Sequence, residues 1–120
     1  MIRRTTSEVI KDMRTKLLGL NQRVYYHEAP ESKTYPYIVF DVRPMGENMM
    51  TVELDLWSMR PDQIAILDLA TRIEESFDNF IFNGPLYTMA LVTNNDTQWL
   101  VDEDKDILHM NLSFTGVYQA

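Results

Sequence analysis

Cysteine is absent from this chain of 120 residues, and glycine and histidine are scarce. Without cysteine, the chain has no disulfide framework, no thiolate nucleophile and no cysteine-containing zinc site. The glycines are scattered at positions 19, 46, 84 and 116, so they form no phosphate-binding loop, and no G-x-S-x-G nucleophile elbow is present. His27 and His109 lack partners at the spacing of metal ligands. We therefore expect a protein that is not an enzyme.

Long hydrophobic runs are also missing, although 45% of the residues are hydrophobic. No stretch approaches the roughly 18 apolar residues of a membrane-spanning helix, and residues 1–8 lack the apolar region of a signal peptide. We expect a soluble, cytosolic protein, and the absence of cysteine fits a reducing compartment. A chain of this length predicts a single domain over residues 1–120 that buries about two-thirds of its unfolded surface.

Basic residues are in the minority, because 11 lysines and arginines accompany 18 aspartates and glutamates, which gives a net charge of −7. Proteins bind phosphate backbones mainly through Lys and Arg, so this balance disfavours nucleic-acid binding. Only the N-terminal segment, up to Arg23, is basic, whereas the acids spread over residues 28–106. This asymmetry would suit docking between unlike surfaces, but the favoured interpretation is a plain solvated helix face.

Two segments have the apolar spacing of helices. Thr5 and Glu8 have the spacing of a capping box, and the apolar residues that follow predict a helix over residues 6–18. Gly19 is expected to end this helix in the left-handed conformation. A second amphipathic helix is predicted over residues 61–79. Its apolar stripe consists of Ile64, Leu67, Ala70, Ile73 and Phe77, widened by Ile66 and Leu69.

The rest of the chain has the pattern of strands and turns. Strands are predicted over residues 24–26, 37–42, 51–57, 86–93, 98–101 and 107–118. In 51–57, apolar and polar residues alternate, so one face belongs to the core and the other, which ends at Trp57, is wet. Residues 94–96 are expected to form the turn of a hairpin. The order of elements predicts an α+β fold with an antiparallel β-sheet and two α-helices packed on one face.

The acidic run at residues 102–106 invites a comparison with calcium-binding loops. Asp102, Asp104 and Asp106 occupy the first, third and fifth places of an EF-hand loop. The sixth place is Ile107 instead of glycine, and the twelfth is Ser113 instead of a bidentate glutamate. The run is therefore interpreted as a solvated turn, and we predict no metal, no cofactor and no catalytic residue.

A polar loop bracketed by Pro30 and Pro36 precedes the strand at 37–42. Each proline fixes its own φ and pushes the preceding residue towards an extended conformation, so covalent geometry orders this loop. A stiff exposed loop presents side chains to a partner, and large aromatic residues with polar tips are enriched at interfaces. The candidate interaction residues are Glu28, Pro30, Glu31, Tyr35 and Trp57.

The order of these segments resembles the tail completion or tail terminator proteins of long-tailed bacteriophages and prophages. The resemblance covers nearly the whole chain, and the order and spacing of its motifs carry it. These motifs are the N-terminal helix, residues 24–26 before Ala29-Pro30, residues 35–40, residues 53–57, the second helix, residues 102–108, and a last strand with Phe114 and Tyr118.

Proteins of that family are small α+β subunits that close into a ring, commonly a hexamer, at the head-proximal end of the tail tube. The ring stops tube polymerisation and joins the tail to the head connector. The resemblance thus implies a virion tail protein that resides in the host cytoplasm during assembly. Its implied partners are copies of itself, the tail tube protein and the head-tail connector protein, with no membrane and no sequence-specific nucleic acid, although DNA passes through the ring.

Other roles stay open beside this one. A head-closure connector and a minor tail protein use similarly small subunits. From other classes, a small metal-dependent hydrolase would use Glu53, Asp55 and the acids of 102–106, because neighbouring carboxylates can share a proton or a metal. A monomeric adaptor would bind a peptide along a sheet edge.

Overall fold

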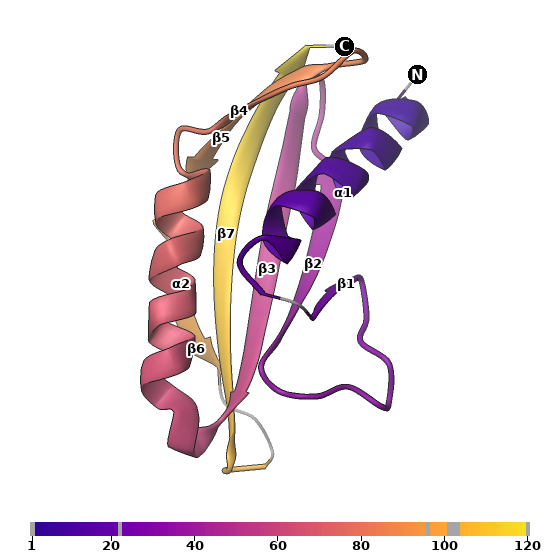
Figure 1. Cartoon of the computed structure of the whole chain (residues 1–120). Coiled ribbons are helices and arrows are strands. Elements are labelled where there is room, and N and C mark those ends of the chain that lie inside the picture. The colour runs from indigo at the N-terminus through magenta and orange to yellow at the C-terminus, as the bar shows by residue number, and fades with distance from the viewer. Residues whose placement is uncertain (1, 22, 96, 101–103, 120) are drawn as a thin grey trace.

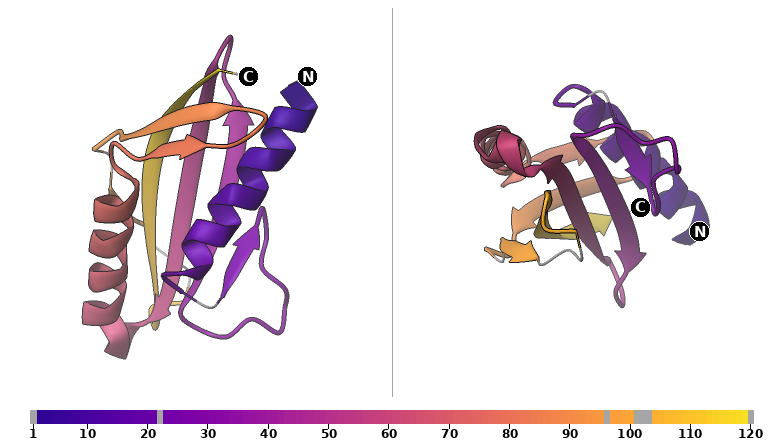
Figure 2. Two further views of the ribbon diagram at one scale, coloured as in Figure 1. Left: turned by 45° about the horizontal axis from the view of Figure 1, so that its top comes forward. Right: turned by 90° about the horizontal axis from the view of Figure 1, so that it is seen from below.

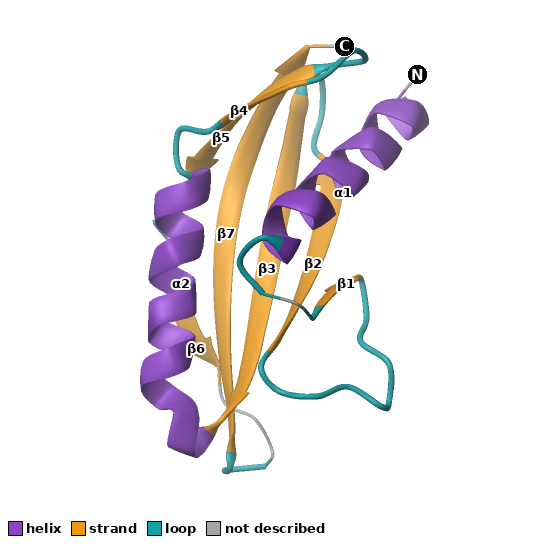
Figure 3. Ribbon diagram, viewed as in Figure 1, coloured by secondary structure: helices purple, strands orange, loops and turns teal. Residues whose placement is uncertain are grey.

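The computed structural model describes residues 2–21, 23–95, 97–100 and 104–119. The helices are α1 (Ile2–Leu18) and α2 (Gln63–Phe77), the latter preceded by the 3-10 turn η1 (Arg60–Asp62). The strands are β1 (Val24–Tyr26), β2 (Tyr37–Pro44), β3 (Met49–Met59), β4 (Ile81–Asn83), β5 (Thr88–Thr93), β6 (Gln98–Leu100) and β7 (Ile107–Gln119). The long strands β2, β3 and β7 form the centre of the sheet (Figure 1, Figure 3). The predicted α+β class is confirmed.

The seven-stranded sheet has the order β1-β2-β3-β7-β5-β4, with β6 beside β7. β3 is antiparallel to both β2 and β7, and Trp57 lies opposite Tyr37 on one side and His109 on the other. β1 runs parallel to β2, so the sheet is mixed and the prediction of an antiparallel sheet is wrong at this edge. Residues 27–36 make this possible, because a parallel pair needs a long connection to return the chain to the start of the next strand.

β5 and β6 lie along the same edge of β7 and do not pair with each other. β5 pairs with residues 114–119 of β7, and β6 pairs with residues 109–111. Both strands are antiparallel to β7, so they run in the same direction and the predicted hairpin is wrong. Asn94 bridges the gap, because its amide nitrogen donates to the Ser113 carbonyl at 3.0 Å and its side chain donates to Ser113 Oγ at 2.7 Å. β4, which the sequence does not predict, pairs with β5 instead.

Even-numbered residues of the long strands form the core, as the period-two pattern predicts. Four apolar residues among them on β3 are fully buried, namely Met50, Val52, Leu54 and Leu56. They share one core with Val9, Met13 and Leu17 of α1 and with Ile66, Ile73 and Phe77 of α2. α1 contacts β1 and β2, whereas α2 contacts β3, β5 and β7. The two helices therefore cover separate parts of a curled sheet (Figure 2).

The start and end of α1 differ from the sequence prediction. Because the helix begins at Ile2, Thr5 lies inside it and is buried against the core at 4% exposure, so Thr5 is not a cap. Gly19 does not adopt a positive φ; Gly46 is the glycine that does. The amides of Leu20 and Asn21 close the end of the helix by donating to the Leu17 carbonyl at 2.9 and 3.0 Å.

α2 buries a different stripe from the predicted one. Its buried residues are Ile66, Leu69, Ala70, Ile73 and Phe77, whereas Ile64 and Leu67 are 83% and 43% exposed. Ile64 precedes Ile66 by two residues and so lies about 200° away around the helix. No helix in the described part of the chain has the length and apolar composition of a membrane span.

Candidate interaction surface

One face of the sheet points away from the even-numbered core side chains. We call this surface the open face and define it by the odd-numbered side chains of β2, β3 and β7, because successive side chains of a strand point to opposite faces. Its members combine into rows across the strands. One row holds Asp41, Glu53 and Ser113; the next holds Val39, Asp55 and Asn111; and the third holds Tyr37, Trp57 and His109. Val39 and Tyr37 are themselves buried at 5% exposure, so the exposed part of these last two rows lies on β3 and β7.

Three rings stack along the last of these rows. Tyr37 and Trp57 have ring centroids 5.1 Å apart, and Trp57 and His109 have centroids 4.0 Å apart, with interplanar angles of 13° and 17°. Tyr35 reaches the same row from the proline loop, with its ring 5.3 Å from that of Tyr37. The structure thus brings together two predicted residues, Tyr35 and Trp57, through Tyr37.

Polar contacts hold this aromatic row in place. Asp55 Oδ1 lies 2.9 Å from His109 Nε2 and accepts a hydrogen bond from Asn111 Nδ2 at 2.9 Å. The side chains of His109 and Asp55 are only 16% and 22% exposed, so this contact fixes the ring that stacks on Trp57. Glu53 has a different partner, because its carboxylate lies 3.6 Å from Arg43 Nη2. The neighbouring carboxylates Glu53 and Asp55 therefore have separate partners, and no shared proton is needed to hold them there.

A second histidine joins the proline loop to the open face. His27 Nδ1 lies 2.9 Å from Asp41 Oδ1. The hydrogen bond to Asp41 raises the pKa of His27, and the negative charge of Asp41 adds to the effect. The backbone of His27 has a φ of 72° and its amide donates to the Phe40 carbonyl at 2.9 Å. The start of the loop is thus anchored on β2 by both side chain and backbone.

The remaining predicted interaction residues, Glu28, Pro30 and Glu31, are all exposed on the loop. The loop projects beside β1, at the outer edge of the sheet (Figure 1). The Lys33 amide donates to the Pro30 carbonyl at 3.1 Å and so closes a turn at this point. Hydrogen bonds therefore order the loop together with its prolines. The open face and the loop form one continuous candidate surface, because Tyr35 and His27 of the loop contact Tyr37 and Asp41 of the open face.

The acidic run falls partly outside the described residues, since Asp102 and Glu103 are not among them. Asp104 organises a tight turn, because its Oδ1 accepts from the Asp106 amide at 2.9 Å and its carbonyl accepts from the Ile107 amide at 3.1 Å. Arg60 Nε donates to the Lys105 carbonyl at 2.7 Å and ties this turn to η1. Within the described ranges, no group of three or more His, Asp and Glu side chains is arranged to hold a metal ion.

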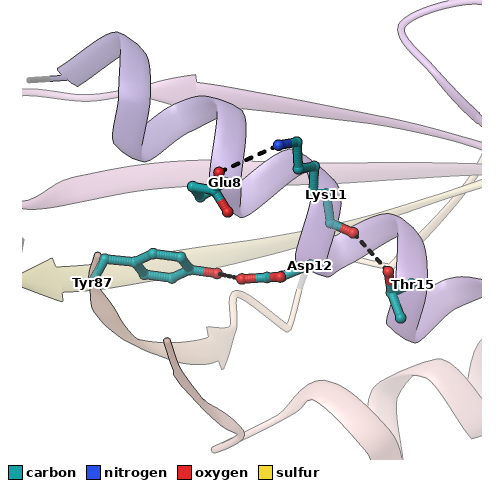
Figure 4. Close-up of polar contacts among 5 residues, drawn as sticks. All are labelled: Glu8, Lys11, Asp12, Thr15 and Tyr87. Carbon is teal, nitrogen blue, oxygen red and sulfur yellow. Dashed lines mark hydrogen bonds and ion pairs between the residues drawn. The ribbon is translucent and has the colours of Figure 1, made fainter. Parts of the chain in front are cut away.

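A groove of about 380 Å³ separates α1 from the turn between β4 and β5. Across it, the Tyr87 hydroxyl donates to Asp12 Oδ2 at 2.5 Å (Figure 4). Burial raises the pKa of Tyr87, and the hydrogen bond to Asp12 raises it further. Lys16 Nζ lies 3.6 Å from the centroid of the Phe80 ring, and burial lowers the pKa of this lysine. Sequence reasoning missed these contacts, because Asp12 and Tyr87 are 75 residues apart and neither belongs to a motif.

Comparisons with known proteins do not place this geometry in a family. No model of a known protein family matches the chain, and no curated protein matches it.

Proposed function

We propose that this chain is a structural subunit of a phage tail, which closes with copies of itself into a ring, ends the tail tube and joins it to the head. The observation that carries the proposal is the open face, where the partly exposed rings of Trp57 and His109, stacked with the buried ring of Tyr37, lie beside carboxylates on one broad surface. Aromatic residues of this kind are enriched where proteins meet. The order of elements in the structure, from N-terminal helix to last long strand, supports the resemblance as well.

The mechanism of such a subunit is steric. A ring seated on the end of the tube covers the surface to which the next tube subunit would add, and its other side receives the connector. Closure of the ring requires two unlike patches on each subunit, because head-to-tail contacts close by rotation. The net charge of −7 lets DNA pass through without adhering, since phosphates are bound chiefly by Lys and Arg.

Deletion of the gene in its phage tests this function. We expect tails of uncontrolled length, or tails that fail to join heads, while capsids still fill with DNA. Expression of the chain from a plasmid should restore joined tails of normal length. Tails of normal length attached to heads in the deletion strain would overturn the proposal.

The loop supplies a sharper variant for the same complementation assay. Replacement of both Pro30 and Glu31 by glycine removes two exposed side chains and leaves the backbone turn to Lys33 available. We expect the variant to fold and to fail in tail joining. The matched control carries glycine at Glu75, an exposed position on α2, and should complement normally. Normal infectivity of the loop variant would remove the loop from the contact surface.

A second candidate function, a peptide-binding adaptor, is favoured by β6. Its three residues are exposed and lie beside a groove lined by Arg60, Trp99, Leu100 and Lys105 among others. An extended peptide would add to such a strand by backbone hydrogen bonds. A chain that stays monomeric and binds a peptide at β6 would favour the adaptor over the ring.

A further inference from the structure

α1 has an excess of positive charge on a molecule that is otherwise acidic. It contains five basic residues, Arg3, Arg4, Lys11, Arg14 and Lys16, against two acidic residues, Glu8 and Asp12. The rest of the chain has six basic and 16 acidic residues. Two copies with a net charge of −7 repel each other in most orientations. An orientation that brings α1 of one copy to an acidic surface of the other is the exception.

Three of the positive charges of α1, those of Arg4, Lys11 and Arg14, lie on its solvent side. Arg4, Ser7, Lys11, Arg14 and Leu18 are all exposed and follow one another at intervals of three or four residues, so they share one side of the helix. We call them the basic row; it rises by about 15 Å from Arg4 to Arg14. Lys11 pairs with Glu8 at 3.3 Å, whereas Arg4 and Arg14 have no ion pair with any residue that the structure describes.

The open face presents the complementary charge. Asp41 lies directly opposite Glu53, and Asp55 follows Glu53 on the same face, so the three carboxylates are spaced by about 5 to 7 Å. Their side chains are 33%, 39% and 22% exposed. Arg43 offsets part of this charge, and the remaining face is net acidic. It continues into Glu28 and Glu31 on the loop.

We infer that the open face of one copy receives the basic row of α1 from a second copy. This inference rests on the proposed function, because it supplies the head-to-tail contact that closes a ring. Single exposed ion pairs contribute little, about 0 to 1 kcal/mol. The contact therefore depends on several pairs in register and on further burial of the partly exposed Trp57 beside them, and the charges select the orientation. Salt weakens such an association, because the Debye length falls to about 3 Å at 1 M ionic strength.

Charge reversal tests the contact in solution. One variant carries Arg4→Glu with Arg14→Glu, and the other carries Asp41→Lys with Glu53→Lys. Measured by analytical ultracentrifugation at low ionic strength, each variant alone should lose the self-association of the wild-type chain. An equimolar mixture should recover it, because the acidic helix of the first variant meets the basic sheet of the second.

A matched control distinguishes the effect of charge at the open face from the effect of the total charge of the chain. Asp68→Lys with Glu75→Lys changes the total charge by the same amount as the open-face variant but alters exposed positions on α2. This control should associate at least as strongly as the wild-type chain. Circular dichroism must show that every variant is folded before its association is compared.

The absence of cysteine allows a direct trap. Ser7→Cys lies in the basic row, and Ser113→Cys lies opposite Glu53 on the open face. A mixture of these two variants should form a mixed disulfide faster than a mixture of Ser7→Cys with Thr71→Cys, which is exposed on α2. The inference is overturned if the trap is no faster than this control, or if the folded reversed variants fail to associate when mixed.

These experiments contain no tail components. Their failure would leave the deletion test of the proposed function standing. Conversely, normal tails in the deletion strain would refute the proposed function without removing a self-contact measured in solution.

Discussion

The hydrogen bond from Tyr87 to Asp12 should contribute measurably to stability, because it joins α1 to the curled end of the sheet across the groove. Tyr87 is 4% exposed, and Tyr87→Phe removes the hydroxyl while it keeps the buried ring. Hydrogen bonds to charged groups contribute about 1.5 to 3 kcal/mol. Water can enter the groove and solvate the half-buried Asp12 in the variant, so we expect a loss of about 1.5 kcal/mol. That corresponds to a fall in Tm of about 5 °C for a domain of this size.

The assay is a double-mutant cycle by urea and thermal unfolding. Tyr87→Phe, Asp12→Ala and the double variant should give a coupling energy of about 1 kcal/mol. Tyr26→Phe is the matched control, because the Tyr26 hydroxyl is more exposed and donates to the neutral Val42 carbonyl at 3.4 Å. It should cost less than about 0.5 kcal/mol. A coupling energy near zero, or equal losses for Tyr87→Phe and the control, would refute the assigned role of this contact.

The stabilisation that Tyr87 contributes through this hydrogen bond should decrease at high pH. Burial and the bond to Asp12 raise the pKa of Tyr87 in the folded state above its ordinary value of 10.0. Below that pH, Tyr87 is protonated in both the folded and the unfolded chain, and its stabilisation is fully present. As the pH rises further, the unfolded chain releases the proton first, so the stabilisation is lost towards the folded pKa. The stability difference between wild type and Tyr87→Phe should therefore shrink above about pH 10.

Three further changes have expected outcomes. Gly116→Ala should destabilise the fold by about 1 to 3 kcal/mol in thermal unfolding, because its Cβ would lie 2.6 Å from Met89 Sδ. The same substitution should cost less stability when it is made in a chain that already carries Met89→Ala. Ser58→Ala should leave stability unchanged or raise it by up to about 1 kcal/mol, since the buried Ser58 hydroxyl has no hydrogen-bond partner within the described ranges. Asp104→Ala combined with Asp106→Ala should leave the chain folded, and calcium or magnesium should not raise the Tm of the wild-type protein; a rise of several degrees at millimolar metal would instead indicate a metal site.

The local pattern of apolar and polar residues was sufficient to predict strands in which every second side chain is buried. β3 and β7 alternate strictly between core and open face, so a period of two predicted both strands and which side of each is buried. α2 was also found, but its stripe was misassigned at Ile64 and Leu67. Apolar side chains predict burial only where a neighbouring element covers them, and the position of that element is a tertiary property.

The sequence pattern did not predict how the strands pair with one another. The direction of β1 against β2, and the sharing of one edge of β7 by β5 and β6, depend on contacts between distant residues. The contacts within the candidate surface could not be predicted from the sequence for the same reason. Tyr35 and Trp57 were selected as interface aromatics, yet their connection through Tyr37, and the fixing of His109 by Asp55, follow from strand register. Register became visible only when the strands were paired.

An exposed sheet face also has to avoid the wrong contacts. At one end of the open face, Met49 and Val117 lie side by side and are 42% and 51% exposed, and at the other end lies the aromatic row. Two such faces would adhere to each other if they were apolar throughout. The carboxylates of Asp41, Glu53 and Asp55 lie between these ends, so stacking two open faces would bring like charges together. In the proposed ring, the same carboxylates would attract α1 of the next copy, so one set of side chains would disfavour the symmetric contact and favour the head-to-tail contact.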